Sequence, residues 1–248
     1  MLEIDGLRKT FDGILALDDF SCGVGEGEIV GLIGPNGAGK TTLFNVATGF
    51  LRPDRGRIAF KGRQLLNLPP YRISRVGIAR TFQNLRLIRQ ISVFENVLLA
   101  FPDQPGERLR NVFFRWKTSQ TREASNRRSA MSLLEDAGLP EKANYPAEAL
   151  SYGQQKLLSL VCCLAAGAEL LLLDEPVAGI APAMIEKITA TIRDLPKQGK
   201  SIVLIEHNLK AVTRVCDRVI FMDAGRKISE GTPEQVRNDP RVMEAYID

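Results

Sequence analysis

Three short apolar runs stand out in the pattern of hydrophobic and polar positions: Glu28–Ile33, Glu169–Leu173 and Ser201–Ile205. Each is too short for a typical helix and is bounded by polar residues, which is typical of strands buried on both faces. Between the last two, Pro182–Leu195 has helical spacing. Strand, helix and strand in this order predict parallel strands with helices on both faces of the sheet, which is an α/β fold.

Two other segments have different patterns. Leu2–Val24 alternates apolar and polar residues around Gly and Asp turns, which predicts antiparallel strands at the N-terminus. Residues 85–149 have no strong strand pattern and carry helical periodicity, for example over Arg127–Ala137, with a turn expected at Pro102–Gly106. We therefore expect a helical lobe inserted into the α/β core.

Composition limits the class of protein without deciding it. The chain has 248 residues, 44% hydrophobic and 25% charged, which suits one globular domain with an inserted lobe. Its four cysteines have no zinc-ligand spacing, so we expect reduced thiols in a cytoplasmic protein. The N-terminus has no apolar signal segment, and the longest uncharged apolar stretch, Leu157–Ala168, is too short to cross a bilayer. Any membrane association is expected to come through a partner.

The net charge of +4 does not by itself indicate nucleic-acid binding, and none is expected. The residues from Phe101 to Ala130 are more basic than acidic. This window is either a solvated helical face or a surface near anionic lipid or an acidic partner. Its basic residues are Arg108, Arg110, Arg115, Lys117, Arg122, Arg127 and Arg128.

A glycine-rich loop lies between the first apolar strand and the helix expected from Lys40 to Thr48. Its backbone N–H groups and the helix N-terminus would surround phosphate oxygens. Lys40 would reach the β- and γ-phosphates, and the Thr41 hydroxyl would bind Mg²⁺. The predicted binding residues for ATP are Gly34, Asn36, Gly37, Ala38, Gly39, Lys40, Thr41 and Thr42.

Two carboxylates, Asp174 and Glu175, follow the buried run Leu170–Leu173. Ligands bind at the carboxyl edge of such sheets. Asp174 is expected to hold Mg²⁺ through its water shell, and Glu175 to polarise the attacking water. His207, the only histidine, follows the next apolar run, where it could contact the γ-phosphate and orient the water.

A second candidate anion site is the segment LSYGQQ, where Ser151 and Gly153 begin an expected helix. The sequence thus holds two phosphate-binding helix ends. One chain cannot easily bring both to one nucleotide, whereas two chains placed head to tail can complete each other's sites.

The ordered set of phosphate loop, Gln83, LSYGQ, LLLLDEP and His207 resembles the ATP-binding subunits of ABC transporters over the whole chain. The resemblance implies a P-loop ATPase core over 1–84 and 155–248, with an antiparallel β-subdomain and a helical signature lobe over 85–154. It implies Gln83 as a catalytic hinge residue that contacts Mg²⁺ or water. It also implies that Phe11 stacks on adenine and that Ser151, Gly153 and Gln154 bind the nucleotide of a partner subunit. Residues Asn84–Phe101 would face the membrane subunit.

Two positions depart from the commonest family pattern. Tyr152 stands where glycine is usual after the serine of the signature, a change familiar in one branch. Ala181 stands where many relatives have an aspartate, so a loop carboxylate that would contact the partner subunit is missing.

The strings RTFQNLRLIRQISVFENVLLA, DEPVAGIAP and LIEHNLKAV are most similar to ATP-binding subunits of branched-chain amino acid importers. This implies permease subunits, a binding protein outside the membrane, an identical or related ATP-binding partner, and a place on the cytoplasmic face of the membrane. Urea or amide importers and a lipopolysaccharide exporter remain alternatives. A mechanical ATPase would need a coiled-coil insertion or tandem domains, and a switch that does not hydrolyse ATP would lack Glu175 or His207.

Overall fold

The apolar runs predicted as strands lie in a six-stranded sheet in the computed structural model, which describes residues 1–102 and 116–245. The strand order is β10-β9-β3-β8-β7-β6, with β10 antiparallel to β9 and the other neighbours parallel. Every residue of β3, β7 and β8 is buried, as their continuous apolar patterns predict. The strands are β3 (Ile29–Ile33), β6 (Ile78–Arg80), β7 (Leu170–Asp174), β8 (Ser201–Ile205), β9 (Arg218–Asp223) and β10 (Arg226–Gly231).

The N-terminal segment forms the predicted antiparallel strands. They belong to a four-stranded sheet of order β2-β1-β4-β5. A two-residue turn joins β1 to β2, and Asp12 and Gly13 both have positive φ, 45° and 87°, as such tight hairpin turns require. The strands are β1 (Leu2–Phe11), β2 (Ile14–Val24), β4 (Arg55–Phe60) and β5 (Arg63–Gln64).

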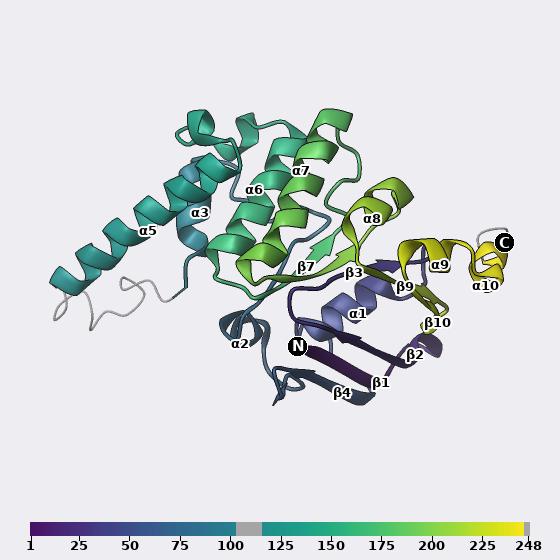
Figure 1. Cartoon of the computed structure of the whole chain (residues 1–248). Helices are drawn as coiled ribbons and strands as arrows, with labels where there is room; N and C mark the ends of the chain where they lie inside the picture. Colours follow the sequence, from purple (N-terminus) through teal and green to yellow (C-terminus); the bar gives the residue numbers. More distant parts are fainter. Residues whose placement is uncertain (103–115, 246–248) are drawn as a thin grey trace. The chain divides into compact units, whose positions relative to one another are not determined.

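Helix α1 (Lys40–Ala47) shares one hydrophobic core with both sheets (Figure 1). The opposite face of the parallel sheet packs on α8, since a Cβ added at Gly31 would meet Cys216 at 3.0 Å and Val212 at 3.3 Å. Helices therefore cover both faces, as the strand and helix order predicts. The other helices of this unit are α2 (Pro70–Arg75), α7 (Pro182–Asp194), η4 (Leu195–Gln198), α8 (Leu209–Val215), α9 (Pro233–Arg237) and α10 (Pro240–Glu244).

The inserted segment is helical, and it forms a compact unit of its own. The structure divides into Met1–Gln83 with Glu169–Asp248, the core unit, and Asn84–Ala168, the helical unit. The second boundary lies after residue 168 and not after 154, because the helix that begins at Tyr152 continues without a break to Ala165. The elements of the helical unit are α3 (Val93–Ala100), α5 (Trp116–Asp136), η2 (Pro140–Lys142), η3 (Ala147–Ala149) and α6 (Tyr152–Ala165).

The helical unit has its own core, to which α3, α5 and α6 each contribute. Ser92 begins α3 with a capping box. Its hydroxyl accepts from the Glu95 N–H, and the Glu95 carboxylate accepts from the Ser92 N–H. In the described residues no helix is long and apolar enough to cross a membrane.

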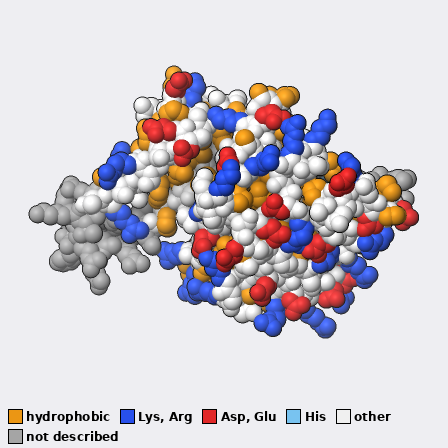
Figure 2. All heavy atoms as spheres, in the orientation of Figure 1, with side chains coloured by type: hydrophobic (Ala, Val, Ile, Leu, Met, Phe, Trp, Pro, Cys, Tyr) orange, Lys and Arg blue, Asp and Glu red, His pale blue; other side chains and the backbone are white. Residues whose placement is uncertain are grey.

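The basic window is only partly described. Arg108, Arg110 and Arg115, the side chain of Lys117 and most of the expected turn at Pro102–Gly106 lie outside the described residues. Arg122, Arg127 and Arg128 lie on α5, and Arg127 contacts Glu123 at 3.3 Å and the Phe94 ring at 5.9 Å. On the face that Figure 2 draws, blue and red side chains are interspersed over the core unit.

Candidate nucleotide site

The register of two parallel strands brings the catalytic candidates together. Asp174 at the end of β7 pairs with Ile205 at the end of β8. The N–H of Glu175 then donates to the Ile205 carbonyl at 2.9 Å. Because β7 and β8 both end at this edge of the sheet, the residues after β7 lie beside the residues after β8.

Glu175 is the centre of this group. Its Oε1 lies 3.2 Å from Nε2 of His207, and its Oε2 accepts from Nε2 of Gln83 at 3.3 Å. Its φ of 48° lies in the left-handed region, where a non-glycine residue is strained, and such strain is concentrated at functional sites. Gln83 and His207, the other two residues predicted to be catalytic, therefore both contact Glu175.

The phosphate loop joins β3 to α1 as predicted, and its glycines meet two different demands. A Cβ at Gly34 would lie 1.9 Å from the Met222 carbonyl oxygen, and one at Gly39 would lie 2.3 Å from that of Ala16. At Gly37, which has a φ of 84°, a Cβ would meet nothing within 4 Å. The first two glycines allow close backbone packing, and Gly37 allows the left-handed turn.

The N-terminus of α1 is available to an anion. Gly39 is the N-cap residue, and no side chain of the described residues caps the helix. The N–H groups of the first turn, which include those of Lys40, Thr41 and Thr42, have no partners further back in the helix. They carry the positive end of the helix dipole, so the structure fits a bound phosphate.

Lys40 is buried beneath its own loop. Its Nζ donates to the carbonyl oxygens of Gly34 and Pro35, both at 2.7 Å. Burial lowers the pKa of Lys40, while the charges of Glu175 and Asp174 oppose that shift. The ammonium therefore lies in the field of both carboxylates, on the loop where phosphates would bind.

Asp174 is buried and held from two directions. Its Oδ2 accepts from Nη2 of Arg80 at 2.8 Å, and its N–H donates to the Thr81 hydroxyl at 3.0 Å. Sequence reasoning missed both partners. The available signal was a charged residue, Arg80, at the end of an otherwise apolar strand three positions before Gln83.

Glu206 is a further residue that the motifs did not identify. It is buried, with 1% of its surface exposed. Its carboxylate accepts from the backbone N–H of Val177 at 2.8 Å, and from those of His207 at 3.2 Å and Asn208 at 3.4 Å. Glu206 thus connects the loop after Glu175 to His207, whose side chain contacts Glu175. The sequence feature that could have identified Glu206 is its position directly after the buried strand β8.

The remaining predicted residues lie in other parts of the molecule. Phe11 ends β1 and is 42% exposed, with Nζ of Lys9 at 5.3 Å from its ring centre. Ser151 is the N-cap residue of α6, in the helical unit, and it forms a capping box with Gln154 around Gly153. The predicted helix start is therefore present.

Ala181, which stands in place of a frequent aspartate, is the N-cap residue of α7. It supplies no side-chain cap, and Pro182 follows as the first helical residue. The missing carboxylate thus leaves this helix start without the acceptor that an aspartate would provide.

The comparison with known families decides the class of this site. The family described as "ABC transporter" matches residues 17–178, which contain the phosphate loop, the helical unit and both acidic residues. The chain belongs to the ABC transporter family. Its fold is that of an ABC ATPase, and the chain is an ATP-binding subunit with ATP hydrolase activity coupled to transport.

Relatives of this ABC ATPase extend the match to its whole length. Residues 226–247 match the family "Branched-chain amino acid ATP-binding cassette transporter". The high-affinity branched-chain amino acid transport ATP-binding protein LivG of Salmonella typhimurium is 40% identical over 248 residues, covering 100% of this chain and 97% of LivG.

Solved structures show the same fold. The ADP conformation of an ATP-binding cassette of an ABC transporter has a TM-score of 0.86 and 33% identity, covering 100% of this chain and 98% of that one. A dimeric bacterial ABC transporter cassette has a TM-score of 0.78 and 25% identity, and the match covers 94% of this chain and 99% of that one. The predicted family and fold are confirmed, and so is nucleotide binding as a property of the family.

Proposed function

We propose that this ABC ATPase drives the uptake of branched-chain amino acids through permease subunits in the membrane. The observation that carries the proposal is similarity along the whole chain. The match to LivG covers 100% of this chain and 97% of LivG, and residues 226–247 match the family described as "Branched-chain amino acid ATP-binding cassette transporter". In this proposal permeases and a binding protein outside the membrane select the cargo.

The core unit supplies the nucleotide site in this proposal. Phosphates bind backbone N–H groups of the loop and of the first turn of α1, from Asn36 to Thr42, and the Lys40 ammonium exchanges its two carbonyl partners for phosphate oxygens. Phe11 stacks on the adenine. The ring of Phe11, which is 42% exposed at the end of β1, supports the last role, since an exposed aromatic ring can stack on a base.

The donor set near the phosphate loop fits Mg²⁺. Thr41 offers a hydroxyl, Gln83 an amide oxygen and Asp174 a carboxylate, and hard cations of this kind prefer oxygen ligands. These three residues would hold the metal together with phosphate oxygens and water. When bound, Mg²⁺ supplies charge neutralisation at the phosphates.

Glu175 is the proposed general base. Its two carboxylate oxygens contact His207 and Gln83, and such contacts would fix the carboxylate and leave it to accept a proton from the attacking water. His207 would orient that water against the γ-phosphate. Glu206 supports the arrangement, because it binds the N–H of His207.

The second half of each site comes from another subunit in this proposal. Ser151, Gly153 and Gln154 begin α6, and a helix start of this kind binds anions. The solved dimeric cassette supports a pair of subunits. We propose that the pair is head to tail, as a homodimer or as a heterodimer with a related chain. Residues Asn84–Phe101 would bind the permease, and the subunit would lie on the cytoplasmic face of the membrane.

Uptake measurements test the proposed cargo. In cells that lack the gene, wild type should restore uptake of labelled leucine, isoleucine and valine, and labelled urea should be unaffected. Lys40→Ala should not restore uptake, because the loop loses its fixed charge on the phosphates.

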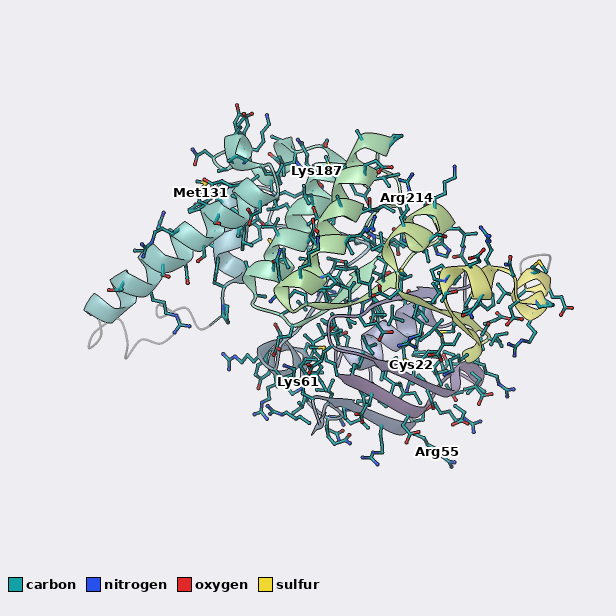
Figure 3. All side chains as sticks on the ribbon, in the orientation of Figure 1. Cys22, Arg55, Lys61, Met131, Lys187 and Arg214 are labelled. Atoms are coloured by element: carbon teal, nitrogen blue, oxygen red, sulfur yellow. The ribbon has the colours of Figure 1, made fainter. Side chains whose placement is uncertain are left out.

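The matched control is Lys61→Ala. Lys61, labelled in Figure 3, is exposed and pairs with Glu169, so its loss should cost less than about 1 kcal/mol and leave uptake intact. Restored uptake of urea without leucine would contradict the proposed cargo.

A further inference from the structure

Arg80 places a positive charge against the aspartate of the proposed metal site. The side chains of Arg80 and Asp174 are only 5% and 6% exposed, and Nη2 of Arg80 donates to Oδ2 of Asp174 at 2.8 Å. None of the roles proposed above uses this arginine. The contact takes one carboxylate oxygen and leaves Oδ1 as the second acceptor.

The guanidinium group of Arg80 is itself held in one orientation. Its Nη1 donates to Oδ1 of Asn45 on α1 at 2.6 Å. Its central carbon lies 5.3 Å from the ring centre of Phe44 and 5.0 Å from that of Phe82. A planar group with partners at both ends and rings nearby cannot turn freely, so the direction of its bond to Asp174 is fixed.

The backbone at Asp174 is held by Thr81, which directly follows Arg80 at the end of β6. The Thr81 hydroxyl accepts from the Asp174 N–H at 3.0 Å, and the Thr81 N–H donates to the Leu172 carbonyl at 3.0 Å. Arg80 therefore holds the side chain of Asp174, and Thr81 holds its main chain. The same segment leads directly to Gln83, another proposed metal-binding residue.

We propose that Arg80 is a positioning residue, which keeps the Asp174 carboxylate in one orientation for Mg²⁺. The inference rests on the proposed role of Asp174. Metal affinity depends strongly on partners that orient a ligand, and their loss usually costs about 10- to 100-fold.

Stability alone does not explain this pair. Replacing a buried ion pair by apolar residues of similar volume is often neutral or stabilising, so packing between α1 and the sheet does not require an arginine here. The N–H at Nε of Arg80 is buried and has no hydrogen-bond partner among the described residues, which adds to the cost of burying this side chain. A requirement on the Asp174 carboxylate accounts for keeping it.

Nucleotide binding with and without metal tests the proposal. Calorimetric titration with the ATP analogue AMP-PNP, in Mg²⁺ or in EDTA, gives two dissociation constants whose ratio is the contribution of the metal. Arg80→Met should reduce this ratio by about tenfold or more, with the constant in EDTA within about twofold of wild type. Spectroscopic titration of Mn²⁺ into the AMP-PNP complex should show the same loss of metal affinity directly.

Two further variants separate positioning from packing. Arg80→Lys keeps a charge but loses the planar fork, so it should also lower the ratio, and it serves if Arg80→Met does not fold. Asn45→Ala removes one of the contacts that orient the guanidinium group and leaves the Asp174 contact itself, so its ratio should fall less than that of Arg80→Lys. A wild-type ratio in Arg80→Lys, or equal losses in Arg80→Lys and Asn45→Ala, would overturn the inference. Wild-type protein that binds no nucleotide in either condition would instead overturn the proposed site.

Discussion

At the scale of the residue, buried charge marks the site. In the described part of the chain, the charged residues with the lowest exposure, counted over backbone and side chain together, are Lys40, Lys156, Asp174 and Glu206. Burying a charge is costly unless it is paired and hydrogen-bonded. Three of these residues surround Glu175: Lys40 through its field, Asp174 as its neighbour and Glu206 through His207. The cost of burial is thus concentrated where the chemistry would occur.

Glu206 offers a test at this scale. Glu206→Ala leaves the buried N–H of Val177 and the partly buried N–H groups of His207 and Asn208 without their acceptor, so the free energy of unfolding should fall by about 1–3 kcal/mol. Displacement of His207 and Val177 should lower kcat at least about tenfold, because small misplacements are costly in catalysis. Binding of ATP should change little, since the phosphate loop is untouched.

Denaturant unfolding, kcat, KM and equilibrium ATP binding together check this expectation. Glu186→Ala is the control, because the exposed Glu186 pairs only with Arg214 at the surface. Wild-type kcat in a folded Glu206→Ala protein would remove Glu206 from the positioning role.

The four cysteines should be unreactive in the folded protein, because burial raises the pKa of their thiols. All four are free thiols, and burial raises the pKa of Cys22, on β2 in Figure 3, and of Cys162 and Cys216 to about 12. Burial also raises the pKa of Cys163. A raised pKa means that the thiolate forms only at high pH, so at about pH 8 a thiolate fraction of about 10⁻⁴ should make reaction with a disulfide reagent slow.

In guanidinium all four thiols should react rapidly, and the rate for the folded protein should still be rising at about pH 10. Rapid labelling of one thiol in folded protein at about pH 7 would contradict this assignment.

At the scale of the element, the sequence predicts more of the fold than of the site. Continuous apolar runs predicted β3, β7 and β8, and the phosphate loop lies between strand and helix as expected. Periodicity does not encode which strands are neighbours or their register. The contact of Glu175 with His207 depends on the pairing of Asp174 with Ile205, and Arg80 reaches Asp174 because β6 lies beside β7. These partners could not be predicted from local pattern.

The phosphate loop supplies a prediction at the scale of the element. Gly34→Ala would place a Cβ 1.9 Å from a backbone oxygen, so it should lower the free energy of unfolding by about 3 kcal/mol or more. Gly37→Ala meets open space and carries only the strain of a left-handed residue, about 1–2 kcal/mol. Urea denaturation of the two variants measures the difference. Equal losses would show that close packing does not explain Gly34.

At the scale of the whole molecule, the residues proposed to bind nucleotide belong to two separate units of the chain. The phosphate loop and catalytic residues belong to the core unit, whereas Ser151 and its helix start belong to the helical unit. Each unit thus offers one helix N-terminus suited to phosphate. The sequence indicates this division through the order of its motifs, but which chain provides the second half depends on assembly, which no local pattern encodes. Ala181 removes one side chain that relatives would use in that assembly.

Glu175→Gln tests both the catalysis and the assembly. The substitution keeps the shape of the side chain and removes the base, so turnover should fall by about 10²–10⁴-fold. ATP should still bind, because Lys40, Thr41 and Asp174 are unchanged. We expect a monomer without nucleotide and, with ATP, a dimer that holds two nucleotides, since Ser151 and Gly153 of each copy would bind the γ-phosphate in the other.

Light scattering with and without ATP, alongside phosphate release, gives the two readouts. Ser151→Ala in the Glu175→Gln background is the matched control, and it should bind ATP while forming less dimer. Its loss of the α6 cap should cost only about 1 kcal/mol, so the protein should remain folded. If the natural partner is a related subunit, the dimer should appear with that pair and be weak with one chain alone. Hydrolysis at the wild-type rate by Glu175→Gln would exclude Glu175 as the base and leave His207 as the nearest candidate, because its Nε2 lies 3.2 Å from the same carboxylate.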